Sequence, residues 1–274
     1  MRKISRVGLI AKEGHGEAKQ IAGDIAKLLL QRGFAVLSFP DLHSKDVEHV
    51  RAVNDLKTSN LDLFVTVSGD GTILRFLRIL DSTVPFLCVN VGGRGILSEV
   101  KPGQIEMALD RLESGDYYMD RRIRIATSVG DTPLASALNE IYVTRQSVTR
   151  TPLFTLEFGK GSVFNQRMDG IIISTPTGST GHSFSYGAPY IEGSLGVFAV
   201  TPLGPIRSFP SVMRAATEMR LMANYPLKLV IDGQETFAVA ADSYFSVDKH
   251  PRDAFFIRFD AGAPYRQLRN LGFA

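Results

Sequence analysis

Two glycines flank one carboxylate in the segment Ser68-Gly69-Asp70-Gly71-Thr72. The glycines permit a sharp turn and leave main-chain N–H groups unshielded, which suits a phosphate group beside the N-terminus of a helix. Phosphate would repel Asp70, but Asp70 could accept a proton from an attacking hydroxyl or help to hold a phosphate-bound Mg²⁺. Because Gly-Asp-Gly is also an ordinary turn sequence, this segment alone leaves a reactive turn and a plain turn both open.

A second glycine-rich segment, from Asn90 to Leu97, follows the apolar run 86–90. The first turn follows a similar run at 61–67, and parallel strands bring their carboxyl ends to one edge of a sheet. The two turns could therefore line one crevice. A turn needed only for packing explains the second segment equally well.

Polar groups suited to a nucleoside occur in two further segments. Asn139 and Glu140 interrupt the strand-like run 138–144 with an amide and a carboxylate, which together could hold a ribose diol and a base. Taken alone, Glu140 fits an exposed strand position better. Serine and threonine hydroxyls crowd the segment 174–185, directly after the apolar run 170–174, where they could bind sugars and adenine edges. Solvated loops also collect such hydroxyls.

The elements that must position these groups change in character along the chain. In the first part, the strand-like runs and the helix-like segments alternate, with strands at 6–11, 34–39, 61–67 and 86–90 and helices at 18–29 and 72–80. Continuous apolar strands separated by helices predict a parallel sheet that is covered on both faces. The fold expected for residues 1–117 is therefore an α/β domain of Rossmann-like type.

Residues 118–274 contain short strand-like runs that lie close together and are joined by turn residues. The runs are 123–129, 138–144, 153–158, 170–174, 195–201, 227–232, 237–241, 244–247 and 255–259. Close spacing without intervening helices predicts an all-β second domain. Its C-terminal end could pack back on the first domain.

Composition argues against several classes of protein. The chain has 274 residues, of which 44% are hydrophobic and 22% charged, so a folded core is expected. The net charge of +3 includes no block of like charges, so neither a nucleic acid nor a membrane is an expected partner. The single Cys88 and the scattered histidines have no metal-ligand spacing, and no protein metal site is expected. Without a recognisable leader or long apolar span, the expected location is cytoplasmic.

In order and spacing, the four segments resemble the motifs of the NAD kinase family, from about Leu61 to the end of the chain. That family carries a Gly-Gly-Asp-Gly-Thr turn, an Asn-x-Gly-x-x-Gly-Phe-Leu loop, an Asn-Glu pair and a long Asp-Gly…Ser-Thr-Pro-Thr-Gly-Ser-Thr-Ala-Tyr segment. The last motif is the most specific, and this chain matches it from Asp169 through Thr180. The resemblance implies transfer of phosphate from ATP or polyphosphate to the 2′-hydroxyl of the adenosine ribose of NAD, which gives NADP.

The resemblance also implies roles for particular residues. Asp70 would accept the proton of the ribose hydroxyl, and Mg²⁺ would arrive with ATP instead of occupying a dedicated protein site. Some contacts would come from a neighbouring subunit, so a homodimer or homotetramer is expected. The positions implied to contact NAD are Asp70, Gly71, Arg75, Asn139, Glu140, Arg150, Arg167, Asp169, Thr180, Gly181, His182, Ser183, Phe184, Ser185 and Gln234.

Three departures from the family motifs have chemical consequences. Ser68 stands where glycine is usual and lacks the freedom of glycine at positive φ. Ile96 stands where phenylalanine is usual. Gly181-His182 replaces Ala-Tyr, and histidine can still stack on a base, with a smaller ring and a titratable edge.

Two other functions fit part of the pattern. A lipid kinase of the diacylglycerol or sphingosine type shares the Gly-Asp-Gly-Thr turn, but it would lack the Asn-Glu pair and the Thr-Pro-Thr-Gly-Ser-Thr segment. A sensor that binds NAD or NADP without catalysis would not require Asp70 beside phosphates. The sequence leaves open the choice between ATP and polyphosphate as donor and between NAD and NADH as acceptor.

Overall fold

The computed structural model describes residues 4–93, 95–159, 162–260 and 262, and it divides into two compact units. The first unit runs to Arg121 and takes up the chain again from Ala254, and the second unit is Arg122–Asp253. The sequence placed one boundary at 117/118. No helix among the described residues is long and apolar enough to cross a membrane.

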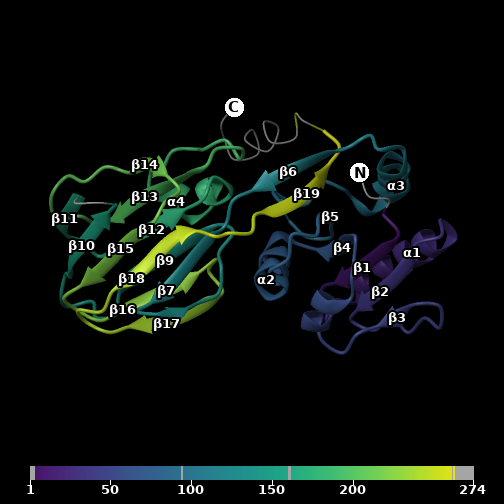
Figure 1. Cartoon of the computed structure of the whole chain (residues 1–274), viewed down its shortest axis with the longest axis horizontal. Coiled ribbons are helices and arrows are strands. Elements are labelled where there is room, and N and C mark those ends of the chain that lie inside the picture. Colours follow the sequence, from purple (N-terminus) through teal and green to yellow (C-terminus); the bar gives the residue numbers. More distant parts are fainter. Residues whose placement is uncertain (1–3, 94, 160–161, 261, 263–274) are drawn as a thin grey trace. The chain divides into compact units, whose positions relative to one another are not determined.

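The first unit is built on a seven-stranded sheet with the order β3-β2-β1-β4-β5-β19-β6 (Figure 1). Its strands are β1 (Arg6–Ala11), β2 (Ala35–Phe39), β3 (Glu48–His49), β4 (Leu63–Ser68), β5 (Phe86–Asn90), β6 (Tyr118–Arg122) and β19 (Ala254–Arg258). The pairings of β1 with β2 and β4, and of β4 with β5, are parallel. The predicted parallel-sheet domain is confirmed. Its helices are α1 (Gly16–Gln31), η1 (Val53–Thr58), α2 (Asp70–Leu80), η2 (Pro102–Gln104) and α3 (Ile105–Ser114).

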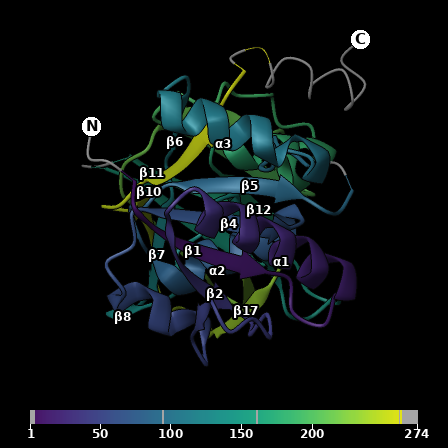
Figure 2. The same ribbon diagram turned by 90° about the vertical axis from the view of Figure 1, so that its right-hand side faces the viewer.

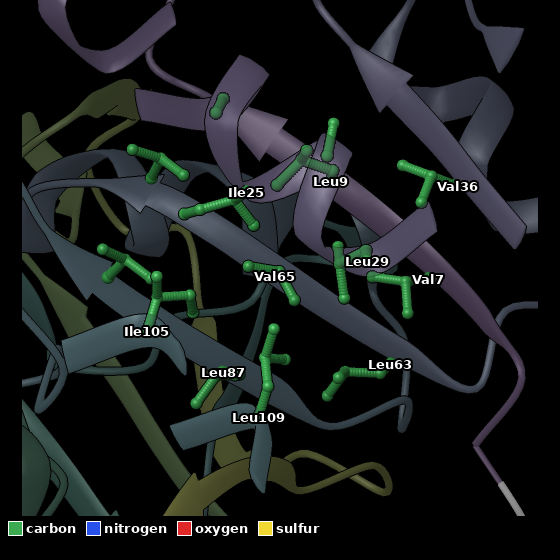
Figure 3. Packing of buried hydrophobic residues seen from close by; sticks show 14 of the residues in the cluster. Val7, Leu9, Ile25, Leu29, Val36, Leu63, Val65, Leu87, Ile105 and Leu109 are labelled. Carbon is green, nitrogen blue, oxygen red and sulfur yellow. The ribbon is translucent and has the colours of Figure 1, made fainter. Parts of the chain in front are cut away.

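One face of this sheet is covered by α1 and α3, which Figure 2 shows on the same side of the strands. In Figure 3, Ile25 and Leu29 of α1 and Ile105 and Leu109 of α3 pack over Val65 and its neighbours. Alternate strand residues point to the opposite face, where the rings of Phe64 and Phe86 stack with centroids 4.9 Å apart. Helix α3 was not among the predicted elements, although its apolar residues recur at helical spacing.

The strand β19 belongs to the first unit, which agrees with the expectation that the C-terminal end could pack back on the first domain but corrects the sheet expected for this strand. Residues 255–259 were placed in the β-rich series, but β19 pairs in parallel with β5 through Phe256 and Phe86. The buried Arg258 donates from Nε to Oδ2 of Asp120 at 3.2 Å and from Nη1 to the carbonyl oxygen of Leu97 at 2.7 Å. The last strand therefore holds the end of the second glycine-rich segment.

The second unit consists of two six-stranded antiparallel sheets, with the orders β11-β10-β15-β18-β7-β8 and β14-β13-β12-β9-β16-β17 (Figure 1). The first sheet contains β7 (Ile125–Val129), β8 (Thr132–Pro133), β10 (Leu153–Phe158), β11 (Ser162–Arg167), β15 (Met219–Ala223) and β18 (Phe245–Lys249). The second contains β9 (Glu140–Arg145), β12 (Gly170–Ser174), β13 (Val197–Leu203), β14 (Val212–Ala215), β16 (Leu227–Ile231) and β17 (Glu235–Val239). Buried residues of both sheets share one core, which includes Phe154, Leu221, Ile171 and Leu229. The expected β-rich domain is confirmed.

Two short helices interrupt the second unit and were not expected in an all-β domain. They are η3 (Thr177–Thr180) and α4 (His182–Ser185), which follow β12 directly. The strands β11 and β15 were also not predicted. Their residues are more mixed in polarity than those of the buried strand β12, so their apolar pattern is weaker evidence for a strand.

Replacing Arg258 with methionine tests the contribution of β19. The substitution removes the donor that Asp120 and Leu97 share, and breaking a buried ion pair on one side costs about 3–5 kcal/mol. We expect the first unit to lose about that much stability, measured by hydrogen exchange at the amides of β5 and β19. Arg207→Met, at an exposed arginine of the second unit, is the matched control. Equal protection of these amides from exchange in Arg258→Met and Arg207→Met would contradict a stabilising role for Arg258.

Candidate functional site

The two glycine-rich turns of the first unit lie against each other. Ser68 ends β4 and is paired with Asn90, which ends β5. Gly69 is the N-cap of α2, and a Cβ on Gly92 would lie 3.3 Å from the Cα of Gly69. A side chain at Gly92 would therefore press the two turns apart.

The carboxylate of Asp70, at the start of α2, is held by the second turn. Oδ2 accepts the main-chain N–H of Ile96 at 2.7 Å, and Oδ1 accepts that of Leu97 at 3.1 Å. The hydroxyl of Ser98 lies 3.4 Å from Oδ1. A carboxylate offers about four acceptor positions, so these contacts leave one position on Oδ2. Asp70 is thus fixed in orientation and can still accept one more hydrogen bond.

Ser68 does not disturb this turn. It is the last residue of an extended strand and is fully buried, so the position requires no left-handed backbone. The loss of glycine at this position therefore carries no backbone penalty. Its hydroxyl has no hydrogen-bond partner within the described part of the chain.

Arg75 and Gly71 are the other two predicted site residues of the first unit. Both lie on α2, and Gly71 is exposed one residue after Asp70. Nη1 of Arg75 lies 3.4 Å from Oε2 of Glu13, and both side chains are about half exposed. An exposed ion pair of this kind is weak, so an anionic ligand could take the place of Glu13.

In the second unit, the Asn139–Glu140 pair stands at the beginning of β9. Glu140 is paired with Ser174 of β12, and only 6% of its surface is exposed. Oε2 of Glu140 has no hydrogen-bond partner among the residues that the structure describes. Burial, together with the nearby charge of Asp232, raises the pKa of Glu140 to about 8. The expectation of an exposed strand residue at Glu140 is wrong.

Asp232 holds the main chain of this pair. Its carboxylate accepts the N–H groups of Leu138 at 3.0 Å, Asn139 at 2.8 Å and Glu140 at 3.1 Å. The N–H of Asp232 in turn donates to the carbonyl oxygen of Glu140 at 3.0 Å. The sequence marked Asp232-Gly233-Gln234 only as a family landmark; the role of Asp232 was missed, although Asp-Gly at a strand end is a turn signal.

The hydroxyl-rich segment is pressed against the same pair. The N–H of Thr175 donates to the carbonyl oxygen of Asn139 at 2.9 Å. A Cβ on Gly178 would overlap that same carbonyl group, and a Cβ on Gly181 would lie 3.4 Å from Oε2 of Glu140. These two glycines allow η3 to approach the start of β9 closely.

Several of the hydroxyls in this segment stabilise the segment itself. Ser183 is buried and donates to the carbonyl oxygen of Gly178 at 3.1 Å, and the Thr180 hydroxyl lies 3.4 Å from the carbonyl oxygen of Thr177. Ser179 donates to the carbonyl oxygen of Pro176 and accepts the N–H of Ile191. Of the predicted contact residues, Phe184 is half-buried and Ser185 is exposed.

His182 forms a stack with two tyrosines. Its ring lies nearly parallel to that of Tyr142, at 5.0 Å between centroids and an angle of 16°. Tyr186 contacts the same ring at 5.5 Å in a tilted arrangement. His182 is exposed, so this stack presents an aromatic surface beside Glu140's strand. The sequence had not marked Tyr142.

Arg150, Arg167 and Asp169 lie away from Glu140. Gly170, next to Asp169, is paired with Thr144, whereas Ser174 at the other end of β12 is paired with Glu140. At about 3.3 Å per residue, the two ends of β12 are separated by roughly 13 Å. Asp169 pairs with Arg145 at 3.2 Å, and Arg150 lies over the ring of Tyr225. Gln234 lies in the exposed turn after Asp232.

The predicted site residues thus fall into three groups. One contains Asp70, Gly71 and Arg75 in the first unit. The other two groups lie in the second unit, one near Glu140 at the end of β12 and the other near Asp169 at its beginning. Within the described part of the chain, no three His, Cys, Asp or Glu side chains are placed to hold a metal ion.

Comparison with known proteins relates both units to one family. The family model for the ATP-NAD kinase N-terminal domain matches residues 7–117, and that for the ATP-NAD kinase C-terminal domain matches residues 138–259. The NAD kinase of Pyrococcus furiosus is 32% identical over 264 residues, covering 93% of this chain and 94% of that protein. The NAD kinase of Methanothermobacter thermautotrophicus is 30% identical over 269 residues, covering 97% and 92%.

Solved structures agree with this relationship. The NAD kinase of Archaeoglobus fulgidus, in a crystal structure in complex with ATP, superposes with a TM-score of 0.78 at 27% identity and covers 97% of this chain and 98% of its own. Yeast NADH kinase complexed with NADH has a TM-score of 0.88 at 19% identity, covers 99% of this chain and 89% of its own, and shares the fold. None of the relatives named above is a lipid kinase. Both domains, in the same order and over nearly the whole length, place this chain in the NAD kinase family.

Proposed function

We propose that this protein is an NAD kinase, which transfers the γ-phosphate of ATP to the 2′-hydroxyl of the adenosine ribose of NAD and so makes NADP. The observation that carries the proposal is the carboxylate of Asp70, which is held at the carboxyl end of β4 with one acceptor position left on Oδ2. A fixed carboxylate with a remaining acceptor position can take the proton of an attacking hydroxyl.

The surroundings of Asp70 suit a phosphate donor. Among the described residues, Gly69 at the N-cap of α2 provides no side chain to cap the helix. The N-terminus of a helix attracts anions through its N–H groups and its dipole. Arg75 lies one turn further along α2. When its side chain leaves Glu13, it would face the phosphate that is transferred. Mg²⁺ keeps water and phosphate oxygens as ligands and needs few carboxylates, so we propose that it enters with ATP and neutralises phosphate charge.

The second unit offers the groups for a nucleoside. We propose that Asn139 and Glu140 hold the ribose and the adenine, next to the close approach of Gly178 and Gly181. An ionised Glu140 would accept hydrogen bonds from ribose hydroxyls or from an exocyclic amine. We also propose, from the sequence, that the protein is cytoplasmic and that polyphosphate can replace ATP as the phosphate donor.

The activity is tested by incubating purified protein with NAD, ATP and Mg²⁺ and measuring NADP with an NADP-specific dehydrogenase. Crossing NAD and NADH against ATP and polyphosphate identifies both substrates. Asp70→Asn should lower turnover by about 10²–10⁴-fold, the usual contribution of a general base. Binding of NAD without any NADP formation would instead support a sensor.

The contacts of Asp70 require a control, because asparagine also alters the bonds to Ile96 and Leu97. Ser98→Ala removes only the weak third contact and should leave turnover near normal. Calorimetry with NAD separates the proposed role of Asp70 as a base from its role in holding the second glycine-rich turn. Loss of a base lowers turnover at unchanged NAD affinity, whereas near-normal turnover in Asp70→Asn would remove Asp70 from the mechanism.

His182 is proposed to stack on a ring of NAD, supported by Tyr142 and Tyr186. An aromatic pair contributes about 0.5–1.5 kcal/mol beyond its buried area. We therefore expect His182→Ala to weaken NAD binding about 3- to 10-fold in calorimetry, and His182→Phe to retain most of the affinity. Unchanged affinity in His182→Ala would reject the stacking role.

Arg150, Arg167 and Asp169 are proposed to serve the site of a second copy, which makes the protein a homodimer or homotetramer. Their place at the far end of β12 from Glu140 supports this arrangement. Arg167 is exposed on the edge strand β11, and its side chain donates from Nη1 to the carbonyl oxygen of Thr151 at 3.1 Å.

Mixing two inactive variants tests the shared site. Asp70→Asn and Arg167→Ala should each have low activity as pure proteins. Random subunit exchange between equal amounts should restore up to about a quarter of the activity, because about one site in four then combines an intact Asp70 with an intact Arg167 from the neighbouring copy. Light scattering should give a dimer or tetramer. A monomer, or no recovery after proven exchange, would contradict the proposal.

A further inference from the structure

We propose that Asp232 is a positioning residue for the nucleoside site: its carboxylate fixes the main chain of Asn139 and Glu140 and maintains a negative charge beside the Glu140 carboxyl group. The inference rests on the proposed function, since it assigns to Asp232 the placing of the residues proposed to hold NAD. Asp232 itself touches the main chain and is not proposed to touch the substrate.

The hydrogen bonds give the first support. Three consecutive N–H groups, from Leu138, Asn139 and Glu140, converge on one buried carboxylate. Such a concave arrangement of N–H groups favours an anion at its centre. The N–H of Asp232 also donates to the carbonyl oxygen of Glu140, so the two residues are joined by a second main-chain contact. The start of β9 is therefore set by Asp232 and not by the β-ladder alone.

The backbone of Asp232 gives the second support. Its φ is +49°, followed by Gly233 at +67°, at the turn between β16 and β17. Glycine adopts this left-handed conformation without the steric cost that a side chain brings. Aspartate occupies the position nevertheless, and its side chain makes the three contacts that glycine could not make.

The charge of Asp232 acts on Glu140. The titratable groups on the elements around Glu140 are Asp232 in the turn, Tyr142 and Arg145 on β9, Lys228 on β16, Glu235 on β17 and His182 on α4, whereas β12 contributes none. Burial is the first cause of the raised pKa of Glu140, and the charge of Asp232 is the second. Glu140 consequently gains its charge only as the pH approaches about 8.

A pH dependence follows with a definite sign. NAD hydroxyls and amines are donors, so they bind the ionised form of Glu140 better. Affinity for NAD should rise with pH until Glu140 is ionised and fall below that range. Removing the charge of Asp232 lowers the pKa of Glu140, so the midpoint of this profile moves to lower pH.

Two variants separate the charge of Asp232 from its contacts. Asp232→Asn removes the charge and turns a donor toward one of the N–H groups. Asp232→Glu keeps the charge but displaces the carboxylate. Asp242→Asn is the matched control, because Asp242 also has a positive φ, of 58°, in a turn of the same unit and is exposed.

The Glu140 carboxyl is followed by carbon-13 NMR in the ligand-free protein, with Glu140→Gln for assignment. We expect Asp232→Asn to lower its midpoint by about one pH unit, and Asp232→Glu and Asp242→Asn to leave it high. The proposal is overturned if the midpoints of Asp232→Asn and Asp232→Glu agree. If Asp232→Asn does not fold, a lowered midpoint in Asp232→Glu overturns it.

Calorimetry with NAD between pH 6 and 9.5 completes the test. Above the midpoint, both Asp232 variants should bind NAD about 10–100-fold more weakly than wild type and Asp242→Asn. The positioning role would be overturned if the Asp232 variants bound NAD as tightly as wild type. It would also be overturned if Asp232→Asn lost affinity at every pH while the midpoint of its pH profile stayed at the wild-type value. The NMR titration tests the effect of Asp232 on Glu140 without any substrate. A failure of the wild-type protein to form NADP would therefore count against the proposed function alone.

Discussion

In each unit, a carboxylate accepts N–H groups from the main chain of a neighbouring segment, and the proposed site residues of that unit depend on this contact. Unpaired buried N–H groups are costly, and one carboxylate can satisfy two or three of them. Asp70 does so for Ile96 and Leu97, and Asp232 does so for residues 138–140. In each case the carboxylate fixes the main chain of the segment that it contacts.

The two carboxylates differ in what they have left to offer. Asp70 retains an acceptor position and lies at the end of a helix, so it can also meet a ligand. Asp232 is almost fully buried and is engaged with the main chain. Its neighbour Glu140 has the unpartnered oxygen instead. The same type of contact thus supports the proposed catalytic base in one unit and the proposed nucleoside-binding carboxyl group in the other.

The sequence predicted strands correctly where the pattern of apolar residues lies within one segment. The strands β1, β5, β10 and β12 were expected at their observed residues, because continuous or alternating apolar runs bounded by turn residues are read within one segment. The sheet to which residues 255–259 belong is a long-range property, and periodicity carries no information about it. For the candidate site, the motifs indicated Asp70 and Asn139–Glu140. The contacts of Asp70 with Ile96, and of Asp232 with Asn139, join residues 26 and 93 positions apart, which no local pattern contains.

The insertion of β19 between β5 and β6 has a consequence for biosynthesis. The ribosome releases β5 and β6 first, then the whole of the second unit, and only afterwards the strand that joins them. Until that moment β6 has no neighbour in its sheet, and the edge of β5 beside Phe86 stays open to other chains. The first unit is therefore completed only after the second unit has been synthesised, and a nascent chain halted before Ala254 would be a target for chaperones.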